Sequence, residues 1–298
     1  MVYHVPALLD ECVTGLNIRP DGIYVDVTFG GGGHSSAILA KLVNGKLVAF
    51  DQDSDVIANV PDDGRLIFLN QNFRFLRNNL RFIGIGKVDG IIADLGVSFH
   101  QFDDPGRGFT FRNDAALDMR MNREAKMKAS DLVATLDEQE LADVFYLYGE
   151  LTNSRRVARA VVEARSVKPI LTAGDLMEAT ARLAPFRQEH KFYARLFQSL
   201  RIAVNHEIDY LKEFLEQALD VLAPGGRLVV LTYHSLEDRL VKNFMKTGNF
   251  SGEEKKDFYG NRETPFHLVT RKAIVPDDEE VARNNRSRSA KLRIAEKV

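Results

Sequence analysis

Four consecutive glycines, Gly30 to Gly33, are the first residues whose type and spacing indicate chemistry. They lie in the segment Asp26-Val-Thr-Phe-Gly-Gly-Gly-Gly-His34-Ser35, where an apolar, β-branched run meets the start of a helical pattern. Glycines at such a turn let a ligand approach the backbone, and the following helix N-terminus offers free N–H groups. A plain glycine-rich turn is the alternative. Because four glycines lose much conformational entropy on folding, we favour a ligand-binding loop.

A second candidate, Asp51, follows the next apolar run and lies 18 positions after Gly33. An acid at the end of this strand can accept hydrogen bonds from the ribose hydroxyls of an adenosine. A helix N-cap is the alternative role, which Asp53 or Ser54 could fill equally well. The glycines and this acid together fit either a dinucleotide or S-adenosylmethionine. Since Asp26 would repel a pyrophosphate but can orient a ligand amine, we favour S-adenosylmethionine.

Two further candidates, Asp94 and His234, lie at the ends of later apolar runs. Ligands of open α/β sheets lie outside the carboxyl ends of the strands, so Asp26, Asp51 and Asp94 are expected at one site. His234 is a base, a substrate contact or a loop residue. The chain has no Gly-x-Ser-x-Gly elbow, no His-Glu-x-x-His and a single cysteine. The sequence therefore predicts neither a Ser/His/Asp hydrolase nor a metal site.

The elements that must position these residues alternate between strands and helices. Strands are expected at 22–29, 46–50, 66–69, 88–93 and 227–232, helices at 35–43, 53–59 and 73–82, and a turn at 224–226. From about 130 to 206 the patterns are helical, at 136–148, 153–165, 173–183 and 195–206, and an amphipathic helix follows at 207–222. This alternation predicts a parallel, doubly wound α/β sheet. We expect one discontinuous domain, 1–105 and 207–298, with a helical insertion at 106–206.

Composition limits the class of protein and its partners. The 298 residues are 45% hydrophobic with a net charge of −2, which is typical of a soluble globular protein. No run reaches the roughly 18 apolar residues of a membrane span, and no signal-peptide pattern is visible, so we expect a cytoplasmic protein. The net charge argues against a nucleic-acid partner, but positive charge is segregated. Residues 281–298 hold six Lys or Arg, including Arg286 and Arg288, against one acid.

The predicted insertion carries two further basic segments. The first contains Arg155, Arg156, Arg159 and Arg165, and the second interleaves Arg187, Lys191, Arg195 and Arg201 with Phe186, Phe192, Tyr193 and Phe197. Arginine and aromatic side chains together can hold phosphates and stack bases. Solvated helix faces with the aromatic residues in a core are the alternative. We expect the insertion and the basic C-terminal segment to hold RNA.

The ordered set of motifs resembles the MraW/RsmH family of bacterial small-subunit ribosomal RNA methyltransferases. The resemblance extends from His4 to about Lys297. Besides the glycine loop it includes His4-Val-Pro-Ala-Leu-Leu-Asp-Glu11, Asp94-Leu-Gly-Val-Ser98, Arg107-Gly-Phe-Thr-Phe111, Leu117-Asp-Met-Arg-Met121, Phe197-Gln-Ser-Leu-Arg-Ile-Ala-Val-Asn205, His234-Ser-Leu-Glu-Asp-Arg239 and Asn285-Arg-Ser-Arg-Ser289.

The resemblance implies a Rossmann-like class I methyltransferase that methylates the exocyclic N4 amine of a cytidine in the decoding region, at the P site, of 16S rRNA in the small ribosomal subunit. It implies that S-adenosylmethionine is contacted by Gly32, Gly33, His34, Asp51, Phe73, Asp94 and Gln101; the residues themselves had indicated Asp26 and Gly30. Asp94 is expected to orient the target amine, with His234 as a secondary catalytic candidate. Arg195, Arg201, Arg286 and Arg288 are the predicted RNA contacts.

The sequence departs from the family pattern at two places that bear on substrate and site. Lys191-Phe-Tyr-Ala-Arg195 stands where the family usually has His-Pro-Ala-Thr-Arg, and Thr232-Tyr233 replaces a Ser-Phe pair. Three other functions remain open: a catalytically silent RNA-binding or ribosome-assembly factor, a nicotinamide-dependent oxidoreductase that uses the same glycines, and a DNA amino-methyltransferase.

Overall fold

The computed structural model describes residues 6–298 except 99–100, 103, 113, 257 and 261–262. The chain divides into two compact units, Met1–Gly96 with Ile208–Val298, and Val97–Glu207. We call them the sheet unit and the helical unit. Within the part of the chain that the structure describes, every helix is too short or too polar to cross a membrane.

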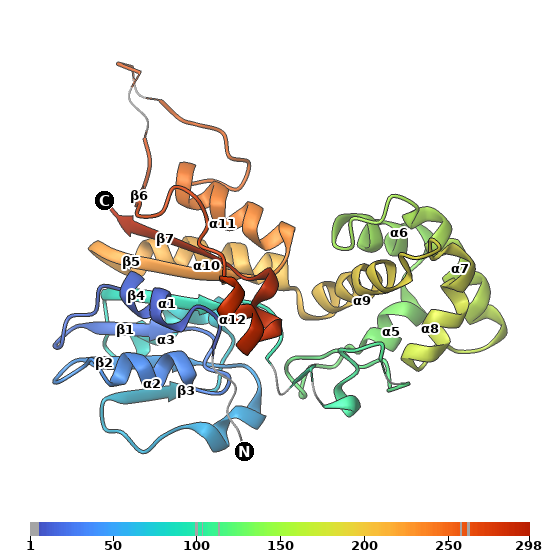
Figure 1. Cartoon of the computed structure of the whole chain (residues 1–298), viewed down its shortest axis with the longest axis horizontal. Coiled ribbons are helices and arrows are strands. Elements are labelled where there is room, and N and C mark those ends of the chain that lie inside the picture. The colour runs from blue at the N-terminus through green and yellow to red at the C-terminus, as the bar shows by residue number, and fades with distance from the viewer. Residues whose placement is uncertain (1–5, 99–100, 103, 113, 257, 261–262) are drawn as a thin grey trace. The chain divides into compact units, whose positions relative to one another are not determined.

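The sheet unit contains a seven-stranded sheet in the order β3-β2-β1-β4-β5-β7-β6 (Figure 1). Its strands are β1 (Ile23–Asp26), β2 (Lys46–Phe50), β3 (Leu66–Leu69), β4 (Val88–Asp94), β5 (Leu222–Thr232), β6 (Phe266–Leu268) and β7 (Lys291–Lys297). The first five strands pair in parallel, while β7 is antiparallel to both β5 and β6. The predicted doubly wound α/β sheet is confirmed.

Helices cover both faces of this sheet. They are α1 (Leu9–Gly15), α2 (Gly33–Leu39), α3 (Leu76–Phe82), α10 (Glu207–Val221), α11 (Ser235–Thr247) and α12 (Asp278–Arg283), with short 3-10 helices η1 (Ser54–Asn59), η2 (Phe73–Phe75) and η5 (Asn285–Ser289). Along β4, Ile91 packs with α3, α10 and α11, whereas Ile92 packs with α1 and α2. Alternate residues of a strand point to opposite faces, so a strand covered on both sides is apolar throughout.

Two sequence predictions about the later strands need correction. Residues 224–226, predicted as a turn, lie inside β5, where the pairing with β4 shifts from Val88↔Leu222 to Gly90↔Arg227. The pairing advances two residues on β4 and five on β5, and within this irregularity Gly225 has a positive φ of 75°. Residues 291–297, at the end of the basic segment 281–298 and without a predicted strand, form strand β7 inside the sheet, because their alternate residues Leu292 and Ile294 pack into the core.

The helical unit has a core of its own. Its elements are η3 (Pro105–Arg107), α5 (Ala129–Thr135), α6 (Glu138–Leu147), α7 (Ser154–Val167), α8 (Ala173–Thr180), η4 (Ala181–Leu183) and α9 (Glu189–Asn205). Capping boxes at Asp137 and Thr172 start α6 and α8, since each side chain accepts the N–H three residues on. Helix α9 begins at Glu189, earlier than the predicted 195, because Phe192 and Tyr193 continue its buried face.

Candidate active site

Three predicted acids lie at one edge of the sheet. Asp26 ends β1, Asp94 ends β4, and Asp51 directly follows β2. Strand β1 pairs in parallel with both neighbours, so that Asp26 lies opposite Ala49 of β2 and Ile92 of β4. This register brings all three carboxyl groups to the carboxyl edge of the sheet, where α/β proteins bind ligands.

The glycine loop runs from β1 into α2. Gly30 and Gly32 have positive φ angles of 53° and 77°, which L side chains rarely adopt. A Cβ atom on Gly32 would lie 2.9 Å from the ring of Phe29, and one on Gly33 would lie 2.2 Å from Cγ of Pro6. The backbone conformation at Gly30 and contacts inside the protein at Gly32 and Gly33 thus explain glycine at three of the four positions. The glycines alone therefore do not indicate a ligand, and the prediction of a ligand-binding loop depends on the neighbouring side chains of Asp51, Asp94 and His34.

Asp51 closes the loop from the side of β2. Its Oδ2 atom accepts a hydrogen bond from the N–H of Gly30 at 2.8 Å, and its Oδ1 atom accepts one from the N–H of Asp53 at 2.9 Å. Asp53, rather than Asp51, caps η1, because its side chain accepts the N–H of Asp55. Burial raises the pKa of Asp51 to about 6. Each of its oxygens keeps a further lone pair that can accept a ribose hydroxyl.

Asp26 is enclosed more completely. It is 1% exposed, and its Oδ2 and Oδ1 atoms accept hydrogen bonds from the Ser35 hydroxyl at 2.7 Å and the Thr28 N–H at 3.0 Å. Burial raises the pKa of Asp26, and the nearby His34 partly offsets that rise. These bonds tie β1 to the start of α2. The contact between Asp26 and a ligand amine stays a prediction.

Asp94 has the most organised surroundings of the three acids. The Tyr233 hydroxyl donates to its Oδ1 atom at 2.7 Å, and its own N–H donates to Thr28 Oγ1 at 2.7 Å. Its side chain is 25% exposed, and His34 Nδ1 lies 3.8 Å from Oδ2. Burial raises the pKa of Asp94 to about 7, the Tyr233 hydrogen bond lowers it, and Glu237 raises it further. This carboxyl group therefore titrates near neutral pH and can still be reached.

His34 faces the same space from α2. Its side chain is 6% exposed, and burial lowers its pKa. Its Nε2 atom is buried and has no hydrogen-bond partner among the described residues. A buried polar atom without a partner is costly, so Nε2 marks a position that a ligand atom or a water molecule would fill.

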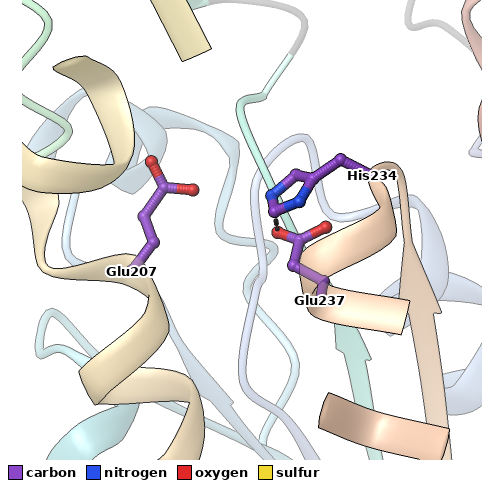
Figure 2. Close-up of side chains that lie close together, drawn as sticks. All are labelled: Glu207, His234 and Glu237. Atoms are coloured by element: carbon purple, nitrogen blue, oxygen red, sulfur yellow. Dashed lines mark ion pairs between the residues drawn. The ribbon is translucent and has the colours of Figure 1, made fainter. Parts of the chain in front are cut away.

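His234 lies just before α11, next to Tyr233. Figure 2 shows its ring beside Glu237. The His234 Nε2 atom lies 3.1 Å from Glu237 Oε1 in an ion-pair arrangement. The other Glu237 oxygen, Oε2, accepts the N–H of Tyr233 at 3.1 Å. The His234 side chain is 10% exposed. Its catalytic role stays a prediction, and Glu237 restricts the orientation of the ring.

The two residues that entered only through the family resemblance lie in different units. Phe73, in η2, packs edge-on against Phe214 of α10 with ring centroids 5.4 Å apart. Gln101 belongs to the helical unit and is 4% exposed, and its Oε1 atom accepts the N–H of Ser98 at 3.2 Å. Their contacts with a cofactor stay predictions. His4, which opens the N-terminal motif, lies outside the described residues.

The predicted RNA contacts have unequal surroundings. Arg286 and Arg288 are exposed on η5, which leads into β7; since Lys291 pairs with Thr232 at the end of β5, η5 lies at the carboxyl edge of the sheet. Arg195 has no ion pair or side-chain hydrogen bond within the described residues. Arg201, in contrast, makes two 2.9 Å hydrogen bonds to Glu207.

Sequence reasoning missed the residues that organise Asp94. Tyr233 had been noted only as a departure from the family pattern, and Thr28 only as part of the glycine segment. A polar hydroxyl directly after a buried strand was the available signal. The sequence could not show that the Tyr233 hydroxyl donates to Asp94, because the two residues are 139 positions apart.

The arrangement suits a cationic ligand that carries an adenosine. Two carboxyl groups with raised pKa values, Asp51 and Asp94, lie at the same edge of the sheet as the glycine loop, and both would ionise more readily beside a positive charge. S-adenosylmethionine is such a ligand, because it carries a sulfonium cation and an adenosine, and the contact between Asp51 and the ribose hydroxyls stays a prediction. A pyrophosphate would add negative charge beside these acids, which argues against a nicotinamide dinucleotide.

Comparisons with known proteins identify the family of this chain. The family model described as the MraW methylase family matches residues 1–298. Proteins named ribosomal RNA small subunit methyltransferase H are 60% identical over 298 residues in Parabacteroides distasonis and 58% identical over 297 residues in Phocaeicola vulgatus, each covering 99% of this chain and 98% of the relative. A solved rRNA methylase from Streptococcus thermophilus aligns with 97% of this chain and 93% of its own, at 13% identity and a TM-score of 0.43. This chain belongs to the MraW methylase family, and it is a methyltransferase whose methyl donor is S-adenosylmethionine.

Proposed function

We propose that this methyltransferase modifies the exocyclic N4 amine of a cytidine in the decoding region, at the P site, of 16S rRNA in the small ribosomal subunit. The names of the relatives support a small-subunit rRNA substrate. The resemblance of the motifs supports the N4 amine of cytidine. The observation that carries the proposal is the Asp94 carboxyl group, which is reachable, titrates near neutral pH and is oriented by Tyr233.

Residues of the sheet unit divide the work of binding. The glycine loop admits the methionine part of the cofactor, Asp51 accepts the ribose hydroxyls, and Asp94 and His34 face the reacting end. When bound, S-adenosylmethionine supplies an electrophilic methyl group on a sulfonium. The Asp94 carboxylate also stabilises that positive charge before transfer.

Orientation of the target amine is the main chemical task of Asp94. The N4 lone pair of cytidine is delocalised into the pyrimidine ring, so the amine is a weak nucleophile. A hydrogen bond from the amine to an Asp94 oxygen turns the lone pair towards the methyl group and favours its localisation. Positioning of this kind and exclusion of water supply most of the rate. The product can release its proton to water, so a strong base is not required.

A labelled-methyl experiment tests the proposal directly. Purified protein is incubated with tritiated S-adenosylmethionine and either small ribosomal subunits, free 16S rRNA or DNA, and the modified nucleoside is identified by mass spectrometry. We expect label on N4 of one decoding-region cytidine, with much less after Asp94→Asn. Absence of transfer would favour a silent assembly factor, label on DNA would favour a DNA methyltransferase, and label on another rRNA position would contradict the site assignment.

A further inference from the structure

The structure separates the aromatic residues that precede and form α9. Phe192, Tyr193 and Phe197 are 5%, 8% and 3% exposed and belong to the core of the helical unit. Phe186, which precedes the helix, is 82% exposed. Of these four rings, only that of Phe186 is free to contact a partner.

Arg187, the next residue in the chain, makes a cation–π contact with the exposed Phe186 ring. Its guanidinium Cζ lies 5.3 Å from the centroid of the Phe186 ring, and its backbone has a positive φ of 62°. Its N–H donates to Glu189 Oε1 at 3.1 Å. A positive φ is unfavourable for a residue with a Cβ. The backbone is thus held in an uncommon conformation where a phenylalanine and an arginine are displayed together.

Three segments of the helical unit that carry or adjoin basic residues lie against one another. Asn153, at the start of α7, donates to the carbonyl of Leu183 at 3.4 Å, and Gln198 of α9 donates to the carbonyl of Tyr148 at 3.0 Å. The turn between α6 and α7 therefore lies against both η4 and α9. Arg155 and Arg156 follow this turn, in the first turn of α7. Lys191 and Arg195 lie one helical turn apart on α9.

These four cations differ from three other basic residues of the helical unit. Arg159, Lys168 and Arg201 are paired with carboxylates. Among the residues that the structure describes, none of Arg155, Arg156, Lys191 and Arg195 has an ion pair.

The position of Arg155 and Arg156 is also unfavourable for the helix that carries them. They lie in the first turn of α7, which has no acidic residue, beside the positive end of the helix dipole. Bound phosphate groups would offset that repulsion, whereas free solvent does so only in part.

We propose that Phe186, Arg187, Lys191, Arg195, Arg155 and Arg156 form a surface that binds single-stranded RNA, on which the Phe186 ring stacks an unpaired base and the cations contact phosphates. This inference rests on the proposed rRNA substrate and assigns part of its recognition to the helical unit. Stacking accounts for the exposed ring, and the unpaired cations give the charge complementarity. A protein partner would leave the four cations without matching groups unless it were acidic.

The decisive variants are Phe186→Ala and a matched control, Phe82→Ala. Phe82 ends α3 in the sheet unit and is 90% exposed, so both changes remove a solvent-exposed phenyl ring. Fluorescence anisotropy with a single-stranded decoding-region RNA is expected to show about tenfold weaker binding for Phe186→Ala, since base stacking on an aromatic ring typically has an effect of this order. Phe82→Ala should bind as the unaltered protein does, and Phe186→Trp should retain binding.

Charge is tested separately. Lys191→Ala with Arg195→Ala should lower the slope of log affinity against log salt, because fewer counterions are released. Equal losses for Phe186→Ala and Phe82→Ala, no loss for Phe186→Ala, or equal affinity of the unaltered protein for single-stranded and duplex RNA would each overturn the inference. Crosslinking of Phe186 to a ribosomal protein in place of RNA would do the same. If the unaltered protein transfers no methyl group to rRNA, the proposed function fails; if it does and Phe186→Ala has no effect, only this surface is wrong.

Discussion

The carboxyl edge of the sheet and the surface of the helical unit use charge in opposite ways. At the sheet edge, Asp51 and Asp94 are largely enclosed, and burial raises their pKa values to about 6 and about 7. In the helical unit, Arg155 is exposed and Arg195 is half-buried, and neither has an ion pair among the described residues, whereas Arg201 is paired with Glu207. The net charge of −2 averages over these regions and describes neither. A buried acid can bind a small cationic ligand, whereas cations on a protein surface can bind a polyanion.

The largest expected effect comes from Asp94→Asn. Methyl transfer should fall by about 10² to 10⁴-fold, because the amine loses its charged acceptor. The folded protein should become more stable at pH 8. An acid whose pKa is higher in the folded than in the unfolded state destabilises the folded protein once it is ionised. The stability of Asp94→Asn relative to the unaltered protein should therefore increase as pH rises from about 4 through about 7, by at most about 4 kcal/mol. Radiolabel incorporation and urea unfolding at several pH values measure both changes. Unchanged transfer would break the assignment of chemistry to the sheet edge.

Arg201→Ala tests whether cations of the helical unit divide into structural and displayed ones. The Arg201 and Glu207 side chains are 17% and 10% exposed, so removal of the arginine leaves a poorly hydrated carboxylate. The free energy of unfolding should fall by roughly 2–4 kcal/mol. Arg195→Ala, the matched control, should change it by less than about 0.5 kcal/mol while weakening RNA binding. Equal stability of the two variants would contradict the division.

Asp51→Ala separates cofactor binding from RNA binding. Two hydrogen bonds to ribose through a charged acceptor would be lost, so affinity for S-adenosylmethionine should fall by roughly 10- to 100-fold. Affinity for RNA should not change, since no part of the displayed cation surface is touched. Calorimetric titration with the cofactor and anisotropy with RNA measure the two affinities. A parallel loss of both would indicate unfolding of the loop, which circular dichroism would reveal.

Tyr233→Phe gives the smallest and most specific effect. The Tyr233 hydroxyl lowers the pKa of Asp94 through its hydrogen bond, so its removal should raise that pKa. The acidic limb of the pH–rate profile should then move to higher pH, with a loss of less than about tenfold at pH 8 because Asp94 is still ionised there. The profile is measured at saturating cofactor. A uniform loss at all pH values would show that Tyr233 acts through packing instead.

Local patterns predicted the sheet edge well. Apolar runs that end in Asp26, Asp51 and Asp94 carry a signal within a few residues, and parallel pairing then determines that their ends meet. Strand β7 was not predicted, because Lys291 and Arg293 give the segment a charged character that outweighs the alternation of Leu292 and Ile294. In the structure both cations bond Asp238 of α11, so this part of the basic segment belongs to the fold.

Pairings across long separations could not be predicted from one sequence. Tyr233 reaches Asp94 from 139 residues away. Arg201 and Glu207 are six residues apart, but helix α9 ends between them at Asn205, and the next residue, His206, has a positive φ of 51° that turns the chain. Helical periodicity therefore gives no indication of this pair. The same limit hid the difference between Phe186 and the buried rings that follow it, because exposure depends on where α9 begins.

The order of strands in the sheet has a consequence for how the protein folds. Strand β4 pairs with β5, which follows only after the helical unit, and β5 is in turn completed by β7. A chain emerging from its N-terminus first forms β1 to β4 with the edge of β4 unpaired, and such an edge can pair with other chains. Independent folding of the helical unit, which has its own core, would bring residues 97 and 207 into a fixed relation and shorten the loop that β5 must close. Folding of the insertion would then precede closure of the sheet, and mutations in the core of the helical unit would slow refolding of the sheet unit.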